Sequence, residues 1–241
     1  MDLRAAHDDW VRERDERVWG ERGIASLAAT HWLWSEPLEL DGVPGRWRAA
    51  DGVVVGEGLA GPGEDRSELR LAPGEEAELA GVLLRAFERD GSVALRVLDA
   101  GAAAARGISA IERFPLDPAA RVPGRVRRRT SEQQTTSVDG HLAVGEFDAV
   151  VELELDGGAV ALAVQEDEGW FFAAFSDATS GEESHPFRFI RFPVPEGEQA
   201  VVDFNRAYLP PCAFSDHYVC VLPVPGNRWS VPIRAGERVV V

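Results

Sequence analysis

The chain has 241 residues, of which 45% are hydrophobic, enough for a folded core in one large domain or two small ones. Its formal net charge is −16, and all 25 basic residues are Arg. This acidic balance argues against nucleic acid and anionic membranes as partners, because both require a positive surface. The absence of Lys also excludes Schiff-base chemistry and a P-loop lysine.

The N-terminal segment predicts a helix. Apolar residues recur at helical spacing between charged ones, at Leu3, Ala6, Trp10, Val11 and Val18. We therefore expect an amphipathic helix within residues 1–23, ended by Gly20 or Gly23. The segment lacks the apolar core of a signal peptide, and no later run reaches the roughly 18 apolar residues of a membrane span. These features predict a cytoplasmic protein.

Residues 24–125 form the expected N-terminal β region. It opens with IASLAATHWLW, which fits either a short helix or a buried strand. From Leu38 to Val97, short apolar runs with a period near two are separated by Gly, Pro and Asp, a pattern typical of antiparallel strands. Asp51-Gly52 and Asp90-Gly91 are the expected hairpin turns, because such turns need residues that tolerate a positive φ.

Residues 100–140 differ from both flanks and carry the boundary between two β regions, which we place after residue 125. A basic cluster lies here, at Arg121, Arg125, Arg127, Arg128 and Arg129. In so acidic a chain we expect it to form a solvated strand face or to pair with carboxylates. A phosphate-binding strip is the alternative.

Residues 126–241 form the expected C-terminal β region, unless the two regions make one fused domain. Val151, Leu153 and Leu155 alternate with acidic residues, which predicts one dry and one wet face. GWFFAAF, at 169–175, is apolar on both faces and predicts a central strand. The expected fold class is mainly β: an antiparallel sandwich or barrel-like structure with an N-terminal amphipathic helix and few short helices.

Polar residues interrupt apolar sequence at 176–181 and at 203–208. The candidate ligand-binding residues in and near these segments are Asp177, Thr179, Ser180, Arg188, Asp203, Asn205, Arg206, Tyr208 and Asn227. If they converge, they supply carboxylates for acid–base work and guanidinium groups for an anionic substrate. We therefore expect a polar pocket for a small anionic or hydroxylated molecule, with hydrolysis by a carboxylate-activated water as one version. Catalytic residues are not identified, because no nucleophile–base signature is present.

Two other interpretations stay open. In the first, the polar cluster is a core hydrogen-bond network in a non-catalytic structural or interaction module, and its groups pair because orphaned buried polar groups are costly. Within the 176–181 segment, Asp, Thr and Ser are also the ordinary residues of a tight loop. In the second, the chain is a flavin-binding split barrel that holds FMN phosphate, an interpretation that rests on fold analogy.

Standard site motifs are missing from the chain. A match to G-x-G-x-x-G at residues 56–61 is interpreted as a loop, since Pro62-Gly63 follows where a helix should begin. Cys212 and Cys220, with His217 between them, offer zinc-binding groups, but their spacing fits neither a knuckle nor a finger. We expect no metal and interpret the two cysteines as structural thiols, reduced in the cytoplasm.

The C-terminal motif FSDATSG…RF, followed by DFNRAYLPPCAF…C…P…NR…PIRAGE, resembles the DUF1684 family of bacterial and archaeal proteins, whose function is unknown. A looser similarity begins at Arg96. The matching pattern positions are Asp177, Thr179, Gly181, Arg188, Asp203, Asn205, Arg206, Tyr208, Pro210, Pro211, Cys212, Cys220, Asn227 and Glu237. Leu209 replaces the family's Asn and His185 its usual Tyr, and the N-terminal half lacks the family's other signals.

Overall fold

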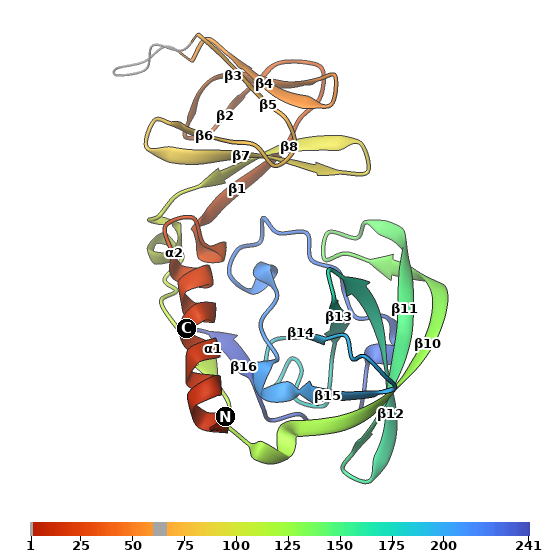
Figure 1. Cartoon of the computed structure of the whole chain (residues 1–241). Helices are drawn as coiled ribbons and strands as arrows, with labels where there is room; N and C mark the ends of the chain where they lie inside the picture. Colours follow the sequence, from red (N-terminus) through yellow and green to blue (C-terminus); the bar gives the residue numbers. More distant parts are fainter. Residues whose placement is uncertain (1, 60–66) are drawn as a thin grey trace. The chain divides into compact units, whose positions relative to one another are not determined.

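Antiparallel strands make up about half of the computed structural model, which describes residues 2–59 and 67–241 (Figure 1). Ala60 and Gly61, which end the G-x-G-x-x-G match, lie outside the described residues. The chain divides into two compact units. We name them the barrel unit, Met1–Arg14 with Ser109–Val241, and the sandwich unit, Asp15–Ile108. The expected division into residues 1–23, 24–125 and 126–241 stays a prediction.

The N-terminal helix α1 spans Leu3–Trp19, which confirms the helix predicted from the spacing of apolar residues. It ends at the expected glycines. The N–H of Gly20 donates to the carbonyl of Glu16 at 3.0 Å. At Gly23 a side chain has no room, because a Cβ there would lie 2.5 Å from the Val18 carbonyl oxygen. No helix among the described residues is long and apolar enough to cross a bilayer.

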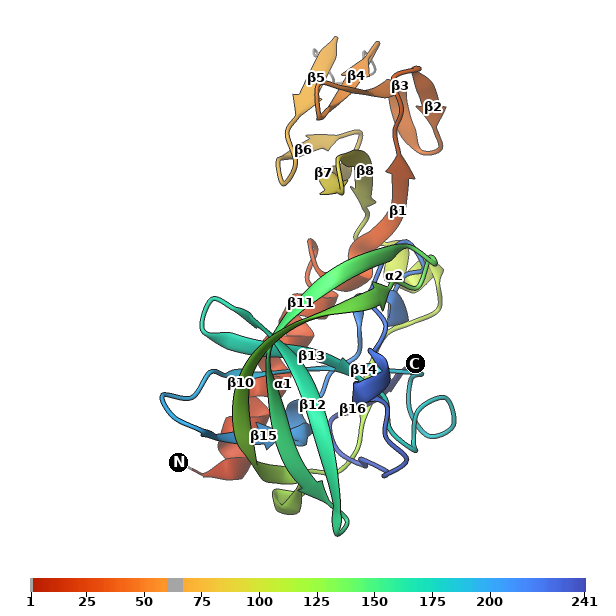
Figure 2. The same cartoon turned by 90° about the vertical axis from the view of Figure 1, so that its right-hand side faces the viewer.

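The sandwich unit contains two four-stranded antiparallel sheets (Figure 2). One has the order β1 (Leu27–Trp32), β8 (Ser92–Leu98), β7 (Val82–Arg89) and β6 (Glu76–Leu79). The other has the order β2 (Leu38–Leu40), β3 (Val43–Ala50), β4 (Val53–Glu57) and β5 (Glu68–Leu71). Both sheets contribute to one apolar core that includes Trp47 and Leu84, so they pack face to face.

The hairpin turns of the sandwich unit lie where the sequence predicted them. Asp51 and Gly52 join β3 to β4 with φ of 52° and 77°, and Asp90 and Gly91 join β7 to β8 with φ of 50° and 79°. Both hairpin turns are thereby confirmed. IASLAATHWLW forms a 3₁₀ helix, η1 (Ile24–Ser26), and then strand β1, which is buried only at Leu27 and half-buried beyond it, so the predicted buried strand is correct in type but not in burial. A short helix α2 (Ala102–Ala105) follows β8.

The barrel unit is built on a six-stranded antiparallel sheet that curls into a nearly closed barrel (Figure 1). Its order is β14 (Arg188–Pro193), β13 (Trp170–Phe175), β12 (Gly158–Asp167), β11 (Leu142–Leu155), β10 (Arg121–Thr136) and β15 (Gln199–Asp203). Strand β9 (Ile111–Arg113) pairs with β16 (Glu237–Val240). The 3₁₀ helices are η2 (Pro118–Ala120), η3 (Phe204–Arg206), η4 (Pro211–Ala213) and η5 (Pro225–Asn227). The mainly β fold class is confirmed.

The periodicity of single strands is also confirmed. On β11, Val151 and Leu153 are buried while Glu152 and Glu154 are exposed. Strand β13 pairs with a neighbour on each side, and its Phe171 and Phe175 are fully buried in the barrel core. Alternation along a strand therefore decides which side chains fill the barrel and which meet water.

Candidate functional site

Asp177 and Arg188 form an ion pair inside the barrel unit. Asp177 follows β13 and Arg188 begins β14, so the connection between two neighbouring strands brings them together. Nη2 of Arg188 lies 2.6 Å from Oδ2 of Asp177, and both side chains are 0% exposed. Burial lowers the pKa of Arg188, and the Asp177 carboxylate opposes that shift. Each charge thus has a partner of opposite sign in place of water.

The same pair holds the C-terminal segment. The Arg188 guanidinium donates to the carbonyl oxygens of Ile233 at 2.8 Å, Ala235 at 2.5 Å and Glu237 at 3.3 Å. The N–H of Ile233 donates to Oδ1 of Asp177 at 3.3 Å. The ion pair therefore fixes the backbone of residues 233–237 against the ends of β13 and β14.

The 176–181 segment is a tight loop closed by its own side chains. The N–H of Thr179 donates to Oδ1 of Asp177 at 2.7 Å, and the N–H of Asp177 donates to Oγ of Ser180 at 3.0 Å. The hydroxyls of Thr179 and Ser184 lie 2.8 Å apart, both on buried residues. These are the local bonds that Asp, Thr and Ser ordinarily make in turns.

Glu237 is a second buried charge. Its carboxylate accepts from Nε of Arg14 at 3.1 Å, from Arg113 at 3.3 Å and from the N–H of Leu209 at 2.7 Å. The Glu237 side chain is 0% exposed and that of Arg14 is 6% exposed. Neither Arg14 nor Arg113 was a predicted site residue, because their carboxylate partner lies more than a hundred positions further along the chain.

The two asparagine candidates bind backbone. The side chain of Asn205 accepts from the N–H of Asp117 at 2.9 Å and donates to its carbonyl at 2.8 Å, and it also donates to Asp203. The side chain of Asn227 accepts from the N–H of Ala163 and donates to the Ala163 and Ala174 carbonyls at 2.8–3.0 Å. Each amide is 1% exposed and serves as a clamp on a distant segment.

Arg206 and Tyr208 lie outside the buried polar network, the name that we give to the buried side chains of Asp177, Arg188, Asn205, Asn227 and Glu237 with their bonded partners. Arg206 keeps 38% of its side chain exposed, donates to the Ala6 carbonyl at 3.4 Å and lies 4.0 Å from Asp203. Tyr208 pairs through its backbone with Phe189 on β14, and the Arg14 guanidinium lies over its ring. The structure thus joins Asp177, Thr179, Ser180 and Arg188 in one cluster and places Asp203, Asn205, Arg206, Tyr208 and Asn227 around other parts of the unit.

A cavity of about 310 Å³ opens beside this network, at the end of the barrel that carries the β11–β12 turn. We call it the barrel-end cavity. Its wall contains three carboxylates, one guanidinium and several apolar side chains, from Asp117, Ala119, Ala120, Val122, Glu154, Leu155, Asp156, Phe204, Val231, Pro232, Ile233, Arg234 and Ala235. None of these charged residues was among the predicted ligand-binding residues, although Glu154 and Asp156 occupy outward positions on β11 and its turn.

The buried polar network fixes the walls of this cavity. Arg188 and Asp177 hold the backbone of Ile233, and Asn205 holds the backbone of Asp117. The remaining charged wall residue from the C-terminal segment, Arg234, is held by two bonds to Glu183 at 2.6 and 2.8 Å. These bonds lower the pKa of Glu183 and raise that of Arg234.

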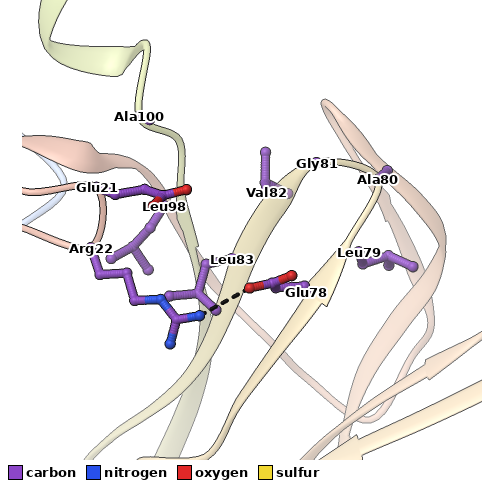
Figure 3. Close-up of a pocket in the computed structure, with 10 residues that line it drawn as sticks. All are labelled: Glu21, Arg22, Glu78, Leu79, Ala80, Gly81, Val82, Leu83, Leu98 and Ala100. Atoms are coloured by element: carbon purple, nitrogen blue, oxygen red, sulfur yellow. Dashed lines mark hydrogen bonds and ion pairs between the residues drawn. The ribbon is translucent and has the colours of Figure 1, made fainter.

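The sandwich unit has hollows of its own. One, of about 380 Å³, is lined by residues 21–22, 78–83, 98 and 100, and Arg22 bonds to Glu78 across it at 2.9 Å (Figure 3). Leu83 and Leu98 form its apolar side. Another, of about 580 Å³, lies between Pro37 and Gly58. Neither contains a residue of the recognised C-terminal motif.

Cys212 and Cys220 are not joined by a disulfide, and the two residues contact each other. The N–H of Cys212 donates to Sγ of Cys220 at 3.3 Å. A hydrogen bond to Cys220 and then burial raise the pKa of Cys212, so it is a thiol at neutral pH. Among residues 2–59 and 67–241, no group of three or more His, Cys, Asp or Glu side chains is placed to hold a metal ion.

The basic cluster on β10 pairs with acidic side chains, one of its two expected roles. Arg125 pairs with Glu198 at 2.9 Å, and Arg127 pairs with Glu152 at 3.1 Å. Arg128 pairs with Glu166. These contacts neutralise much of the strip and leave less charge for a phosphate ligand.

Comparison with known proteins finds a family model and a solved structure that each match part of the chain. A family model described as "Protein of unknown function (DUF1684)" matches residues 107–238. Among solved structures, the chain is similar to the uncharacterized protein from gene locus rrnAC0354 of Haloarcula marismortui, determined in solution by NMR. The two are 26% identical, the match covers 56% of this chain and 78% of that one, and the TM-score is 0.46. No curated protein matches the chain.

Proposed function

This chain belongs to the DUF1684 family, as its C-terminal motif predicted, and on that premise we propose that it binds a small hydroxylated molecule in the barrel-end cavity. The observation that carries the proposal is the pairing of that cavity with the buried polar network. Motif residues that do not line the cavity hold the backbone of those that do. Such second-layer support is typical of binding sites that must keep a fixed geometry.

The chemistry of the wall favours hydroxyl groups over anions. Asp117, Glu154 and Asp156 bring three carboxylates, whose oxygens accept hydrogen bonds from hydroxyl donors. Arg234 is the cation of the wall, and its guanidinium is already bound to Glu183. A phosphate or carboxylate ligand would meet net repulsion here. We therefore narrow the expected ligand class from anionic or hydroxylated to hydroxylated.

The apolar part of the wall adds a second property of the ligand. Phe204, Val231 and Ile233 line the cavity beside the carboxylates. A molecule with hydroxyl groups on one side and C–H groups on the other, such as a sugar or a cyclitol, satisfies both. A volume of about 310 Å³ lies at the lower end of the range for small-molecule sites.

The core-network interpretation has support of its own, because Asp177, Arg188, Asn205 and Asn227 are buried and bonded to protein groups. It is compatible with binding if these residues support the site from behind. The flavin interpretation is the least supported, since Arg188 is enclosed and bound, and carboxylates line the cavity. A hydrolytic version would require one of the three wall carboxylates to activate water.

Ligand-observed NMR with neutral probes tests the proposal. Glucose, ribose and inositol are offered at millimolar concentration, with glucose 6-phosphate as the anionic counterpart. We expect saturation transfer to at least one neutral probe and weaker transfer to the phosphate. Asp156→Asn should lower the affinity for the bound probe about tenfold, which corresponds to the loss of one charge-assisted hydrogen bond.

Glu146→Gln is the matched control. Glu146 is an exposed carboxylate on the same strand, β11, outside the cavity. It should leave probe affinity unchanged. Equal affinity of wild type and Asp156→Asn for every probe, or preference for the phosphate, would refute the proposal. Hydrolysis is tested separately, by incubation with nitrophenyl glycosides and nitrophenyl esters.

A further inference from the structure

The two cysteines lie at the ends of a loop that is held by its own hydrogen bonds. Cys212 belongs to η4, which begins at Pro211, the second of two prolines, and Cys220 lies eight residues further along the chain. Between them, the N–H of Tyr218 donates to the carbonyl of Ser215 at 3.2 Å, and the N–H of His217 donates to Oγ of Ser215 at 3.4 Å. The loop returns on itself and brings the N–H of Cys212 to 3.3 Å from Sγ of Cys220.

The two thiols differ in access. Cys220 is buried, 8% exposed, in a cluster with Phe187 and Phe189. Its carbonyl accepts from the N–H of Val138 at 2.9 Å, which anchors this end of the loop to the β10–β11 hairpin. Cys212 is of intermediate exposure. Cys212 is thus the more exposed of the two, and we expect a reagent in solution to attack it first.

We propose that Cys212 and Cys220 form a reversible dithiol–disulfide pair that reacts with low-molecular-weight disulfides. The proposal is independent of the barrel-end cavity, because neither cysteine lines it. It rests on the 3.3 Å contact between the N–H of Cys212 and Sγ of Cys220, on the hydrogen-bonded loop and on the difference in access.

The reaction has two balanced steps. The thiolate of Cys212 attacks one sulfur of glutathione disulfide, so a bond from Cys212 to glutathione forms and one glutathione thiolate leaves. The Cys220 thiolate then attacks Sγ of Cys212, forms the internal disulfide and releases the second glutathione. The two cysteines lose two protons and two electrons in total, and glutathione disulfide gains them.

The environment of Cys212 sets the pH dependence. Its hydrogen bond to Cys220 and its burial raise its pKa, so little thiolate is present at neutral pH. The first step should therefore accelerate as the pH rises above neutrality. The second step is intramolecular between neighbouring groups and should be fast, so the mixed disulfide should not accumulate.

Intact mass spectrometry tests the pair in the whole chain. The native protein is incubated with glutathione disulfide at several pH values, denatured, and labelled with iodoacetamide. We expect a product that carries neither glutathione nor alkyl label. Cys220→Ser should instead hold one glutathione on Cys212, and Cys212→Ser should stay unmodified while folded.

Two results on the wild-type chain would overturn the proposal, whether or not the variants fold. One is a stable glutathione adduct with no internal disulfide. The other is a folded protein that still carries two alkyl labels, and therefore two unreacted thiols, under conditions in which the urea-unfolded chain has already formed its disulfide. Reduction of the product with dithiothreitol should return both labels, and failure to do so would exclude a reversible pair.

Discussion

Oδ2 of Asp177 lies 2.6 Å from Nη2 of Arg188, and neither side chain touches solvent. Replacement of Arg188 by Met should leave the Asp177 carboxylate buried without its counter-charge and three backbone carbonyls without a donor. Breaking such a pair costs about 3–5 kcal/mol. We expect a fall of that size in the free energy of unfolding, measured by urea titration.

Arg191→Met provides the control for this prediction. Arg191 lies on the same strand, β14, and pairs with Asp167 at 3.4 Å, but its side chain is 41% exposed and that of Asp167 is 71% exposed. Exposed pairs contribute about 0–1 kcal/mol. Comparable losses in the two variants would show that burial of the Asp177–Arg188 pair does not determine its contribution.

Asn205→Asp tests the clamp on Asp117. The substitution keeps the shape of the side chain but replaces its N–H₂ donor by an oxygen that faces the Asp117 carbonyl and Asp203. We expect a loss of roughly 2 kcal/mol or more in unfolding free energy, because a buried acceptor is left facing acceptors. Asp117→Asn should cost under about 1 kcal/mol, since Asn205 binds only the backbone of Asp117. A larger loss in Asp117→Asn would contradict this account.

Gly236→Ala should be far more damaging than Gly181→Ala, although both glycines have a positive φ, of 78° and 82°. A Cβ at Gly236 would lie 2.7 Å from the Phe204 carbonyl oxygen and closer still to that of Ala207, whereas a Cβ at Gly181 would meet nothing within 4 Å. Left-handed backbone alone costs Ala about 1–2 kcal/mol. We expect that cost for Gly181→Ala and a several-fold larger loss, or no soluble protein, for Gly236→Ala. Equal melting temperatures would disprove the steric argument.

His185 should make the protein less stable in mild acid. Its pKa is lowered by burial, so the folded state binds a proton less readily than the unfolded chain. The stability from the neutral ring is fully present above the unfolded pKa of about 6.5 and is lost as the pH falls through the lower folded pKa. His185→Gln should therefore flatten the dependence of unfolding free energy on pH below about 6.5. The check is a urea titration of both proteins at several pH values between neutrality and mild acid, and an unchanged slope would argue against the prediction.

The elements that could be predicted from sequence are those with a local cause. Asp51-Gly52 and Asp90-Gly91 form the predicted turns because the required positive φ belongs to the residues themselves. Alternation on β11 gives the inward and outward faces because side chains on a strand alternate with a period of two. The spacing of apolar residues before Gly20 predicted helix α1 because side chains on one face of a helix recur every three to four residues.

Site geometry was predictable only in part. The motif marked Asp177, Arg188 and Asn205 as unusual polar residues in apolar surroundings, and they are indeed buried and bonded. Their partners could not be predicted. Asp117 lies 88 positions from Asn205, and Glu237 lies 223 positions from Arg14. No local pattern encodes such distances along the chain.

The sequence alone determined the strand and turn pattern, the acidic surface and the family, since each depends on composition or on residues close together in the chain. Only the tertiary structure decided that Arg188 binds the backbone of Ile233 and that Asp117, Glu154 and Asp156 share a cavity. The reason is that curling the sheet into a barrel brings together ends of strands that are remote in sequence. Which polar groups then meet depends on that closure and on the need of each buried group for a partner.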